Sequence, residues 1–303
     1  VDFDFLSSIE ILILDQADIF QMQNWQHVLH IFEHLHKQPK ELHGTDVTRV
    51  RMWALNGQSQ YYRQTAIFST VLTPEIRSVF GRFGKNFAGC VKVPYKMNPS
   101  GELPLVKAEL SQSFHRFVAQ DILSESKARL EFFTEKILHH YRDDAMDHTL
   151  IFIPSYYDYV RIRNYMKTEG FSFVQVCEYS KPNKVAAARD LFFRGKKQFL
   201  LLSERAFFYH RYVIKGIRHL LFYQAPTYPK FYSELCNSVG YGAPIGANDE
   251  GEKPGDKAEK PTCSLIYSKF DALKLGGVLG TKSAKDLIND ERPVHMIFSD
   301  SKE

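Results

Sequence analysis

Acidic and amide side chains follow an apolar run near the start of the chain. Residues 9–14, IEILIL, are almost all aliphatic, and Asp15, Gln16, Ala17 and Asp18 come directly after them. Carboxylates at the end of a buried strand can hold the magnesium ion of a bound nucleotide, directly or through water. The same spacing also suits acids in the first turn of a helix, so the pattern is open to both a nucleotide site and a plain helix start.

A second polar pair follows the next apolar run. Residues 64–72, QTAIFSTVL, predict a strand followed by Ser69 and Thr70, and a helix is predicted to start at Thr73. Together these two stretches resemble the second and third motifs of the DEAD-box RNA helicases, whose third motif is Ser-Ala-Thr. Three further stretches follow the order of that family's second RecA-like domain: residues 150–166, 177–206 and 214–237.

One departure from the helicase pattern affects the catalytic base. Gln16 stands where helicases carry the glutamate that polarises the attacking water. An amide has nearly the same shape as a carboxylate but cannot accept a proton. Because general-base help of this kind is worth about 10²–10⁴ in rate, its loss alone would slow the reaction severely.

Two further departures lie in the second half of the chain. Ser203 and Glu204 stand where the fifth helicase motif begins, and residues 231–240, FYSELCNSVG, contain none of the arginines that contact the transferring phosphate. Loss of such an arginine costs roughly 10³–10⁵ in rate. The resemblance therefore implies a pseudo-helicase with no catalytic residues, no cofactor and no small-molecule substrate. The alternative is a slow RNA-dependent ATPase or RNA-remodelling enzyme that still binds nucleotide.

Longer aromatic-rich strings support a narrower resemblance. DQADIFQMQNW, PSYYDYVRIRNY, KQFLLLSERAFFYHRY and PTYPKFYSELCN are similar to stretches of the digestive organ expansion factor family, the U3 small nucleolar RNA-associated proteins of the small-subunit processome. This resemblance implies a protein of the nucleus and nucleolus that acts in pre-ribosomal RNA processing and 40S subunit biogenesis. The implied partners are processome proteins and the U3 ribonucleoprotein, with pre-rRNA or the small nucleolar RNA as a further contact.

The elements that must position these residues alternate between strands and helices. Helical periodicity predicts helices after Asn24, from a cap at Ser126, from Pro154 to Gly170, and from Val185 to Gly195. The alternation predicts an α/β protein with doubly wound parallel sheets, and the helicase resemblance makes them two RecA-like domains. Apolar runs, several of them nearly continuous, predict strands at residues 9–14, 65–69, 87–93, 150–153, 172–177, 198–202, 220–223, 263–267 and 294–298.

Composition divides the chain into segments. Pro94 to Pro104 is rich in Pro, Gly and Asn, so we expect domains at residues 1–110 and 111–303, with the boundary near Leu110. Residues 240–261 carry Gly, Pro, Lys and Glu with almost no large apolar side chains, which predicts a mobile surface insertion. A strand follows the first residues almost at once, so we expect a C-terminal piece whose first RecA-like domain is incomplete.

Two clusters of tyrosine and arginine are candidates for a contact surface. Such residues stack on single-stranded RNA when exposed, anchor protein partners equally well, or belong to the core. The sequence alone leaves all three roles open. The first cluster lies on one predicted helix and contains Tyr156, Tyr157, Arg161 and Arg163, and the second contains Tyr209, Arg211 and Arg218.

Composition excludes several other classes. With 303 residues, 44% of them hydrophobic, the chain can form a substantial core, and no apolar run approaches the roughly 20 residues of a membrane span. The net charge of +4 permits contact with nucleic acid but does not argue for it. The four cysteines form no Cys-x-x-Cys pair, and His27, His30 and His34 share a helical face without acidic or thiol neighbours in a metal-binding pattern. We therefore predict reduced thiols and no metal site.

Overall fold

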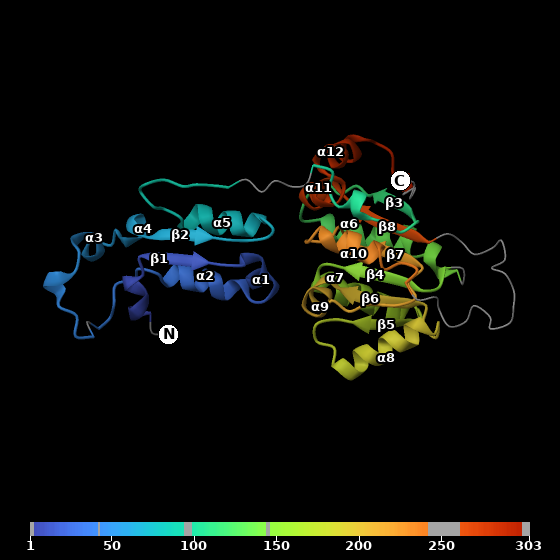
Figure 1. Ribbon diagram of the computed structural model, residues 1–303, viewed down its shortest axis with the longest axis horizontal. Coiled ribbons are helices and arrows are strands. Elements are labelled where there is room, and N and C mark those ends of the chain that lie inside the picture. Colours follow the sequence, from blue (N-terminus) through green and yellow to red (C-terminus); the bar gives the residue numbers. More distant parts are fainter. Residues whose placement is uncertain (1–2, 42, 94–98, 144–145, 242–260, 299–303) are drawn as a thin grey trace. The chain divides into compact units, whose positions relative to one another are not determined.

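The computed structural model describes residues 3–41, 43–93, 99–143, 146–241 and 261–298. Its residues fall into two compact units, Val1–Tyr95 and Lys96–Glu303, and both combine helices with parallel strands (Figure 1). The predicted α/β class is therefore confirmed.

The boundary between the units lies earlier than predicted. The sequence placed it near Leu110, but residues 102–110 belong to the second unit. The backbone N–H of Glu102 donates to the carbonyl oxygen of Val278 at 2.8 Å. The backbone N–H of Lys107 donates to Oδ1 of Asn237 at 2.7 Å. These bonds tie the segment to helices that are distant in the sequence, which composition alone does not reveal.

The first unit is built on two parallel strands, β1 (Ile11–Leu14) and β2 (Gln64–Ile67), both of which were predicted. Two helices, α2 (Trp25–His34) and α5 (Pro74–Phe83), pack on them. Asn24 is the N-cap residue of α2, as expected, and the helix ends at His34, before Pro39. The buried core consists of Val28, Phe32, Leu35 and Val79, with Leu12, Leu14 and Ile67 packed against it. The remaining helices of this unit are α1 (Ala17–Met22), α3 (Met52–Leu55) and α4 (Ser59–Tyr62).

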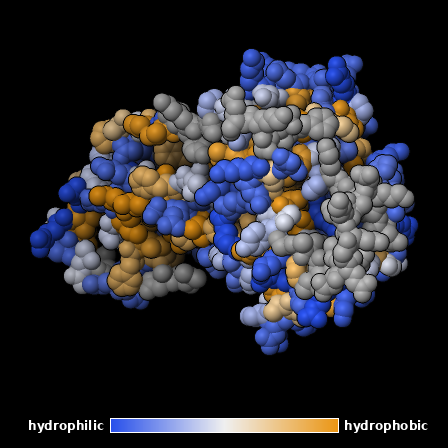
Figure 2. All heavy atoms as spheres, turned by 45° about the vertical axis from the view of Figure 1, so that its right-hand side comes forward, coloured by the Kyte–Doolittle hydropathy of each residue, from blue (hydrophilic) through white to orange (hydrophobic). Residues whose placement is uncertain are grey.

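The opposite face of this strand pair is apolar and open to solvent. Side chains alternate between the two faces of a strand, so Ile11 and Ile13 point away from the core that contains Leu12. Ile11 and Ile13 are 63% and 62% exposed, and Phe68, just after β2, is 56% exposed. Figure 2 shows that apolar residues form patches on the surface of the molecule, next to hydrophilic ones.

The second unit contains a seven-stranded sheet in the order β5-β6-β4-β7-β8-β3-β9. Every neighbouring pair is parallel except β3 and β9, which are antiparallel. All of these strands except β3 were predicted from apolar runs. Their bounds are β3 (Ser111–Arg116), β4 (Thr149–Ile153), β5 (Phe173–Val176), β6 (Phe199–Ser203), β7 (His219–Phe222), β8 (Thr262–Tyr267) and β9 (Val294–Phe298).

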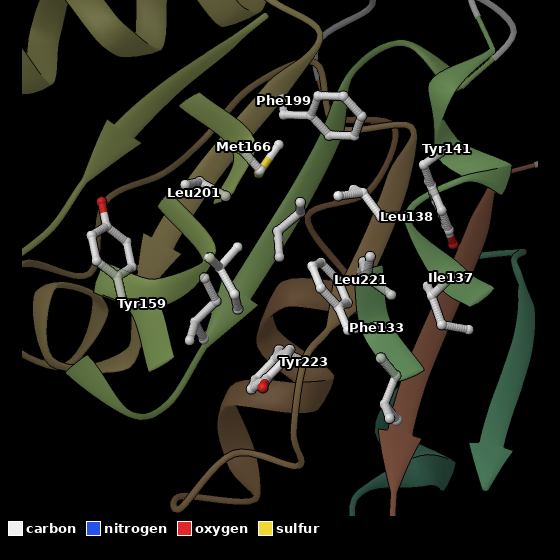
Figure 3. Packing of buried hydrophobic residues seen from close by; sticks show 14 of the residues in the cluster. Phe133, Ile137, Leu138, Tyr141, Tyr159, Met166, Phe199, Leu201, Leu221 and Tyr223 are labelled. Carbon is white, nitrogen blue, oxygen red and sulfur yellow. The ribbon is translucent and has the colours of Figure 1, made fainter. Parts of the chain in front are cut away.

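Helices cover both faces of this sheet, as the doubly wound prediction required. On one face Ile151 and Ile153 of β4 pack in a core that includes Tyr159, Phe133 and Leu221 (Figure 3). On the other face the ring of Phe152 meets that of Phe207 edge-on, with centroids 6.3 Å apart. The continuous apolar sequence of β4 follows from this burial on two sides.

Two of the predicted helices of the second unit, those after Pro154 and from Val185, are present with small shifts of their ends. The helix after Pro154 begins with Ser155 as its N-cap residue, whose hydroxyl accepts from the backbone N–H of Asp158. The helix predicted from Val185 starts earlier, at Pro182, because proline is favoured in a first helical turn. None of the helices in the described ranges is both long and apolar enough to cross a bilayer. Their bounds are α6 (Glu125–Phe132), α7 (Tyr156–Thr168), α8 (Pro182–Phe193), α9 (Glu204–His210), α10 (Lys230–Cys236), α11 (Ala272–Leu279) and α12 (Thr281–Asn289).

Several local predictions were wrong. Residues 87–93 form no strand, because Asn86 folds back locally: its Oδ1 accepts from the backbone N–H of Ala88 at 2.9 Å, and Gly89 has a φ of 97°. Ser126 is not a helix cap, since α6 starts after Ser124 and the Ser126 hydroxyl instead donates to Asp158 at 3.0 Å. The predicted mobile insertion lies, apart from Gly240, Tyr241 and Pro261, outside the described residues.

A buried arginine joins the loops that follow β7 and β8. Arg129 of α6 is 1% exposed, and its guanidinium donates to the carbonyl oxygens of Tyr223 and Ile266, each at 3.2 Å. It also pairs with Glu125 and, at 2.6 Å, with Asp271. Burial alone favours the neutral acid, but the charge of Arg129 and several hydrogen bonds hold the pKa of Asp271 below its ordinary value. The arginine thus neutralises buried carboxylates and fixes two strand ends at once.

We predict that Arg129→Met lowers the free energy of unfolding of the second unit by about 3–5 kcal/mol, because it leaves Asp271 buried without its counter-charge. Arg194→Met is the matched control, since Arg194 pairs with Asp190 on the surface, where both side chains are about half exposed. That control should cost less than about 1 kcal/mol. Urea denaturation measures both, and equal losses in the two variants would contradict the role given to Arg129.

Helix α11 packs so closely against Pro229 that any side chain at position 277 would clash. A Cβ atom at Gly277 in α11 would lie 2.3 Å from Cγ of Pro229, whose ring cannot rotate away. We predict that Gly277→Ala destabilises the protein, because overpacking costs about 1–3 kcal/mol and outweighs the gain in helix propensity. Gly81→Ala in α5 is the control, with no atom within 4 Å of the added Cβ. It should stabilise by about 0.5–1 kcal/mol in the same urea experiment. A stabilised Gly277→Ala variant would show that α11 can move.

Candidate functional site

The predicted acidic stretch lies at the carboxyl end of β1. Gln16 occupies the left-handed backbone region, with a φ of 52°, and precedes helix α1. Asp15 accepts a hydrogen bond from the backbone N–H of Gln16 at 2.9 Å through its Oδ1. Both side chains are exposed, so both are accessible to a ligand at this edge. Ala17 is fully buried, which anchors the turn between strand and helix.

The second acid of the stretch joins it to the Ser-Thr pair. Asp18 is 6% exposed, and its Oδ1 accepts from the Ser69 hydroxyl at 3.3 Å and from the Thr70 backbone N–H at 3.5 Å. The backbone N–H of Ala17 donates to the carbonyl oxygen of Phe68 at 2.9 Å. The structure therefore brings together the two predicted motifs, which are about fifty residues apart in the chain. Asp18 contributes to this junction, while Asp15 and Gln16 stay accessible.

Ser203 and Glu204, at the carboxyl end of β6, are occupied by internal contacts. The Ser203 hydroxyl donates to Glu178 at 2.8 Å and accepts from the backbone N–H of Ala206. Glu204 is 1% exposed, and its Oε1 accepts from the backbone N–H groups of Thr227 at 2.7 Å and Tyr228 at 3.2 Å. Burial raises the pKa of Glu204, although Lys274 and these hydrogen bonds favour the carboxylate. Glu204 thus holds the loop after β7 rather than facing solvent.

Helix α10, which includes the start of the stretch without arginine, packs into the core of the second unit. Phe231, Tyr232 and Leu235 are buried, and the ring of Tyr232 stacks on that of Phe222 with centroids 4.9 Å apart. Its exposed side carries Glu234, which pairs with Arg211, and Lys230, whose Nζ lies 3.7 Å from the Glu234 carboxylate. The surface of this helix therefore offers no arginine to a phosphate.

The first tyrosine and arginine cluster surrounds the start of α7. Tyr157 is 70% exposed, whereas Arg161 is held by the Ser126 hydroxyl at 2.9 Å and by Asp158 at 3.5 Å. Arg163 hydrogen-bonds only the neighbouring Asn164 among the described residues. Tyr156 is 39% exposed. Tyr156 and Tyr157 are thus the exposed members of this cluster, and Arg163 is partly exposed without a contact to another helix among the described residues.

Sequence reasoning missed a further member of the first cluster. Tyr179, in the loop between β5 and α8, is 66% exposed, and its ring meets that of Tyr156 edge-on with centroids 5.1 Å apart. Tyr179 is separated from Tyr156 by a strand and a helix, so no local periodicity could have joined them. The available signal in the sequence was that Tyr179 lies just before Lys181 and Pro182, in a short loop where a side chain is often exposed.

The second cluster does not form one surface patch. Arg211 pairs with Glu234 and lies over the ring of Phe231, with its guanidinium carbon 4.3 Å from the centroid. It therefore fixes the end of α9 to α10. Tyr209 is 42% exposed and Arg218 is exposed, but no contact joins them to Arg211 within the described residues. Among all the residues that the structure describes, no group of His, Cys, Asp and Glu side chains is arranged to hold a metal ion.

Two family models match the chain, one for each unit. The model described as "UTP25, NTP hydrolase-like domain" matches residues 1–91, and the model described as "Utp25, C-terminal domain" matches residues 102–297. These two segments agree with the two compact units of the structure.

Curated relatives match almost the whole chain. The U3 small nucleolar RNA-associated protein 25 homolog of Xenopus tropicalis is 48% identical over 98% of this chain, and the human homolog is 46% identical over 99%. Protein NUCLEOLAR FACTOR 1 of Arabidopsis thaliana is 37% identical over 96%. The chain spans 37%, 38% and 36% of these relatives, respectively, and thus well under half of their length.

Solved structures of helicases align loosely with the chain. A DEAD box protein from Methanococcus jannaschii aligns with a TM-score of 0.38 and 13% identity, covering 92% of this chain and 59% of that protein. The yeast DEAD-box splicing factor Prp28 aligns with a TM-score of 0.38 and 12% identity, covering 95% of this chain and 55% of that protein. Alignments this loose do not indicate a function.

The family, by contrast, is established by the sequence matches. The C-terminal family model alone covers most of the chain, and the relatives exceed one-third identity along nearly all of it. The predicted resemblance to U3 small nucleolar RNA-associated proteins is confirmed, and the chain belongs to the Utp25 family.

Proposed function

We propose that the chain is the helicase-like part of a non-catalytic scaffold of the small-subunit processome. It acts there in U3-dependent pre-ribosomal RNA processing, in the nucleolus. The printed names of the relatives, U3 small nucleolar RNA-associated protein 25 and NUCLEOLAR FACTOR 1, support this setting. Processome proteins and the U3 ribonucleoprotein are the proposed partners, with RNA as a further contact.

The position of Gln16 is the observation that carries the proposed loss of catalysis. Its neighbours keep the geometry of a nucleotide site, since Asp15 is exposed and Asp18 joins the Ser69–Thr70 turn. A water molecule activated at this edge would need a group that accepts its proton, and the Gln16 amide cannot do so. In the second unit, the surface of α10 carries Glu234 and Lys230 but no arginine that could contact a transferring phosphate. The missing proton acceptor and the missing arginine both favour a scaffold over an enzyme.

The exposed face of β1 and β2 fits a first domain that is incomplete in this chain. Ile11, Ile13 and Phe68 form an apolar row that water would normally not reach in a finished α/β domain. We propose that other segments of the same domain cover this row in the full-length protein. The chain's share of its relatives' length leaves room for such segments.

We predict that the full-length protein does not hydrolyse ATP at helicase rates when single-stranded RNA is present. Gln16→Glu should leave the rate unchanged, because α10 still lacks an arginine. Gln26→Glu on the exposed side of α2 is the matched control. Phosphate release is the measurement. A wild-type turnover of about 1 s⁻¹, the low end of common enzyme rates, would overturn the scaffold proposal in favour of a slow ATPase. The same turnover in Gln16→Glu alone would show that catalysis does not need an arginine from α10.

We also predict that recruitment to pre-ribosomes depends on the accessible tyrosines and arginines rather than on the acidic edge. Arg163→Glu and Arg218→Glu should weaken co-purification of processome components, because charge reversal at a partner-facing arginine commonly costs a few kcal/mol. Arg161 and Arg211 are unsuitable test positions, since they hold helices together.

Two variants serve as controls for that experiment. Asp15→Ala removes the exposed acid at the end of β1 and should keep all partners, and Lys282→Glu reverses an exposed charge on α12 away from both clusters. Circular dichroism checks that each variant folds. If Asp15→Ala loses its partners while Arg163→Glu and Arg218→Glu keep them, the acidic edge is still in use and the scaffold proposal fails.

A further inference from the structure

A cavity of about 170 Å³ lies at the amino end of the strand pair in the first unit. Its lining includes Glu10, which directly precedes β1, and Arg63, which directly precedes β2. The acidic edge with Asp15 and Gln16 lies at the carboxyl ends of the same strands. The cavity is therefore separate from the predicted nucleotide site, and its role does not depend on the proposed loss of catalysis.

Arg63 in this cavity is a buried cation without a counter-charge. It is 3% exposed, and its guanidinium donates to the Thr65 hydroxyl at 3.0 Å and to the carbonyl oxygen of Phe83 at 2.7 Å. No carboxylate of the described residues lies within ion-pair distance of it. Burial alone lowers the pKa of Arg63, with no acidic neighbour to offset the effect. Buried charges in proteins are normally paired, so this site lacks an anion.

His36 is a second cavity residue whose hydrogen-bonding capacity is unused. Both ring nitrogens are buried and have no partner of normal geometry among the described residues, although the Ser7 backbone is near enough to favour the charged ring. Burial and then the charge of Arg63 lower the pKa of His36. The backbone of His36 has a φ of 62°, an uncommon conformation for this residue type that the surrounding structure must hold in place.

The other walls of the cavity define what can enter. Arg51 already pairs with Glu10 at 3.8 Å and lies over the ring of Trp53, so the lining keeps one net positive charge from Arg63. Ile9, Val50 and Ala54 add apolar surface, and Ser59 adds a hydroxyl. At about 30 Å³ for each water-sized group, the space holds roughly five or six such groups. Pockets for drug-sized ligands are larger, about 300–1,000 Å³.

The volume of the cavity and the positive charge of its lining together favour one class of ligand. A phosphate within a nucleic-acid strand carries a sugar on each side, and with these sugars it is too bulky for a space of about 170 Å³. A carboxylate on a short flexible stem fits this space, with its methylene groups against Trp53 and the aliphatic wall. Arginine binds carboxylates through two parallel hydrogen bonds, which suits this planar group.

We propose that this cavity is a docking site for an acidic side chain, glutamate or aspartate, from a partner protein. The carboxylate pairs with Arg63, and the ring of His36 supplies a second donor once it is protonated. The bound carboxylate favours the charged imidazole and so opposes the lowering of the His36 pKa by burial and by Arg63. Binding therefore tightens as the pH falls through the range in which His36 becomes protonated. The scaffold would thereby hold a partner through its first unit, away from the tyrosine and arginine clusters.

Glutarate, which carries a carboxylate on a glutamate-like stem, is the probe for this site. The full chain is labelled with 5-fluorotryptophan at position 53 only, and the fluorine resonance is followed during titration. We expect a saturable shift with a dissociation constant in the millimolar range, which corresponds to only about −4 kcal/mol. Glutaramide, which is neutral, should give no saturable shift, and inorganic phosphate, which has no methylene stem to pack against Trp53, should bind more weakly than glutarate. Affinity for glutarate should rise on going from alkaline to mildly acidic pH.

Matched variants assign the effect to the proposed residues. Arg63→Lys keeps the charge but loses the planar fork and should weaken glutarate binding about tenfold, whereas Arg49→Lys on the nearby surface should leave it unchanged. His36→Asn, which tolerates the positive φ, should remove the pH dependence, and it keeps the test decisive if Arg63→Lys does not fold. An absent glutarate shift, equal binding of phosphate or glutaramide, or an unchanged pH dependence in His36→Asn would overturn the proposal.

Discussion

The second unit depends on a single buried cation at the carboxyl edge of its sheet. Arg129 reaches the carbonyl oxygens that end β7 and β8 and neutralises Glu125 and Asp271. Parallel sheets usually bind ligands at this edge, because loops and helix starts converge there. Here the polar groups satisfy one another instead. Glu204 likewise holds the backbone after β7. The edge where a helicase would bind its ligands is, in these places, part of the internal framework.

At the acidic edge of the first unit, the residues that hold the local packing differ from the residue on which the proposed loss of catalysis rests. Asp18 joins α1 to the turn at Ser69 and Thr70, so its carboxylate is needed for local packing whether or not nucleotide binds. Gln16 lies in an exposed left-handed turn and contributes little to that packing. A residue at such a position can change from acid to amide at small structural cost. Geometry and catalysis are therefore separable at this edge, and geometry alone does not imply turnover.

The sequence predicts elements that bury apolar runs and misses those held by distant partners. β4, β6 and β7 are buried along their length, so their composition identified them. β3 is polar, SQSFHR, and is stabilised by pairing with β8 and β9, which lie far away in the chain. Residues 87–93 have strand-like composition but no neighbouring strand to pair with. The Arg129 network and the Arg63 cavity each combine separate segments, so no local pattern could reveal them.

Comparison of the two buried arginines distinguishes the two units. Arg129 and Arg63 are 1% and 3% exposed, so both lose nearly all contact with water. Arg129 is compensated by two carboxylates of its own unit, whereas Arg63 has only neutral acceptors. Because an unpaired buried charge is costly, the first unit is stable only at some expense that an anion would relieve. The apolar face of its strands β1 and β2 is also exposed to water, and covering that face would likewise stabilise the first unit. The second unit thus compensates its buried arginine from within, whereas the proposed anion and covering segments would supply what the first unit lacks.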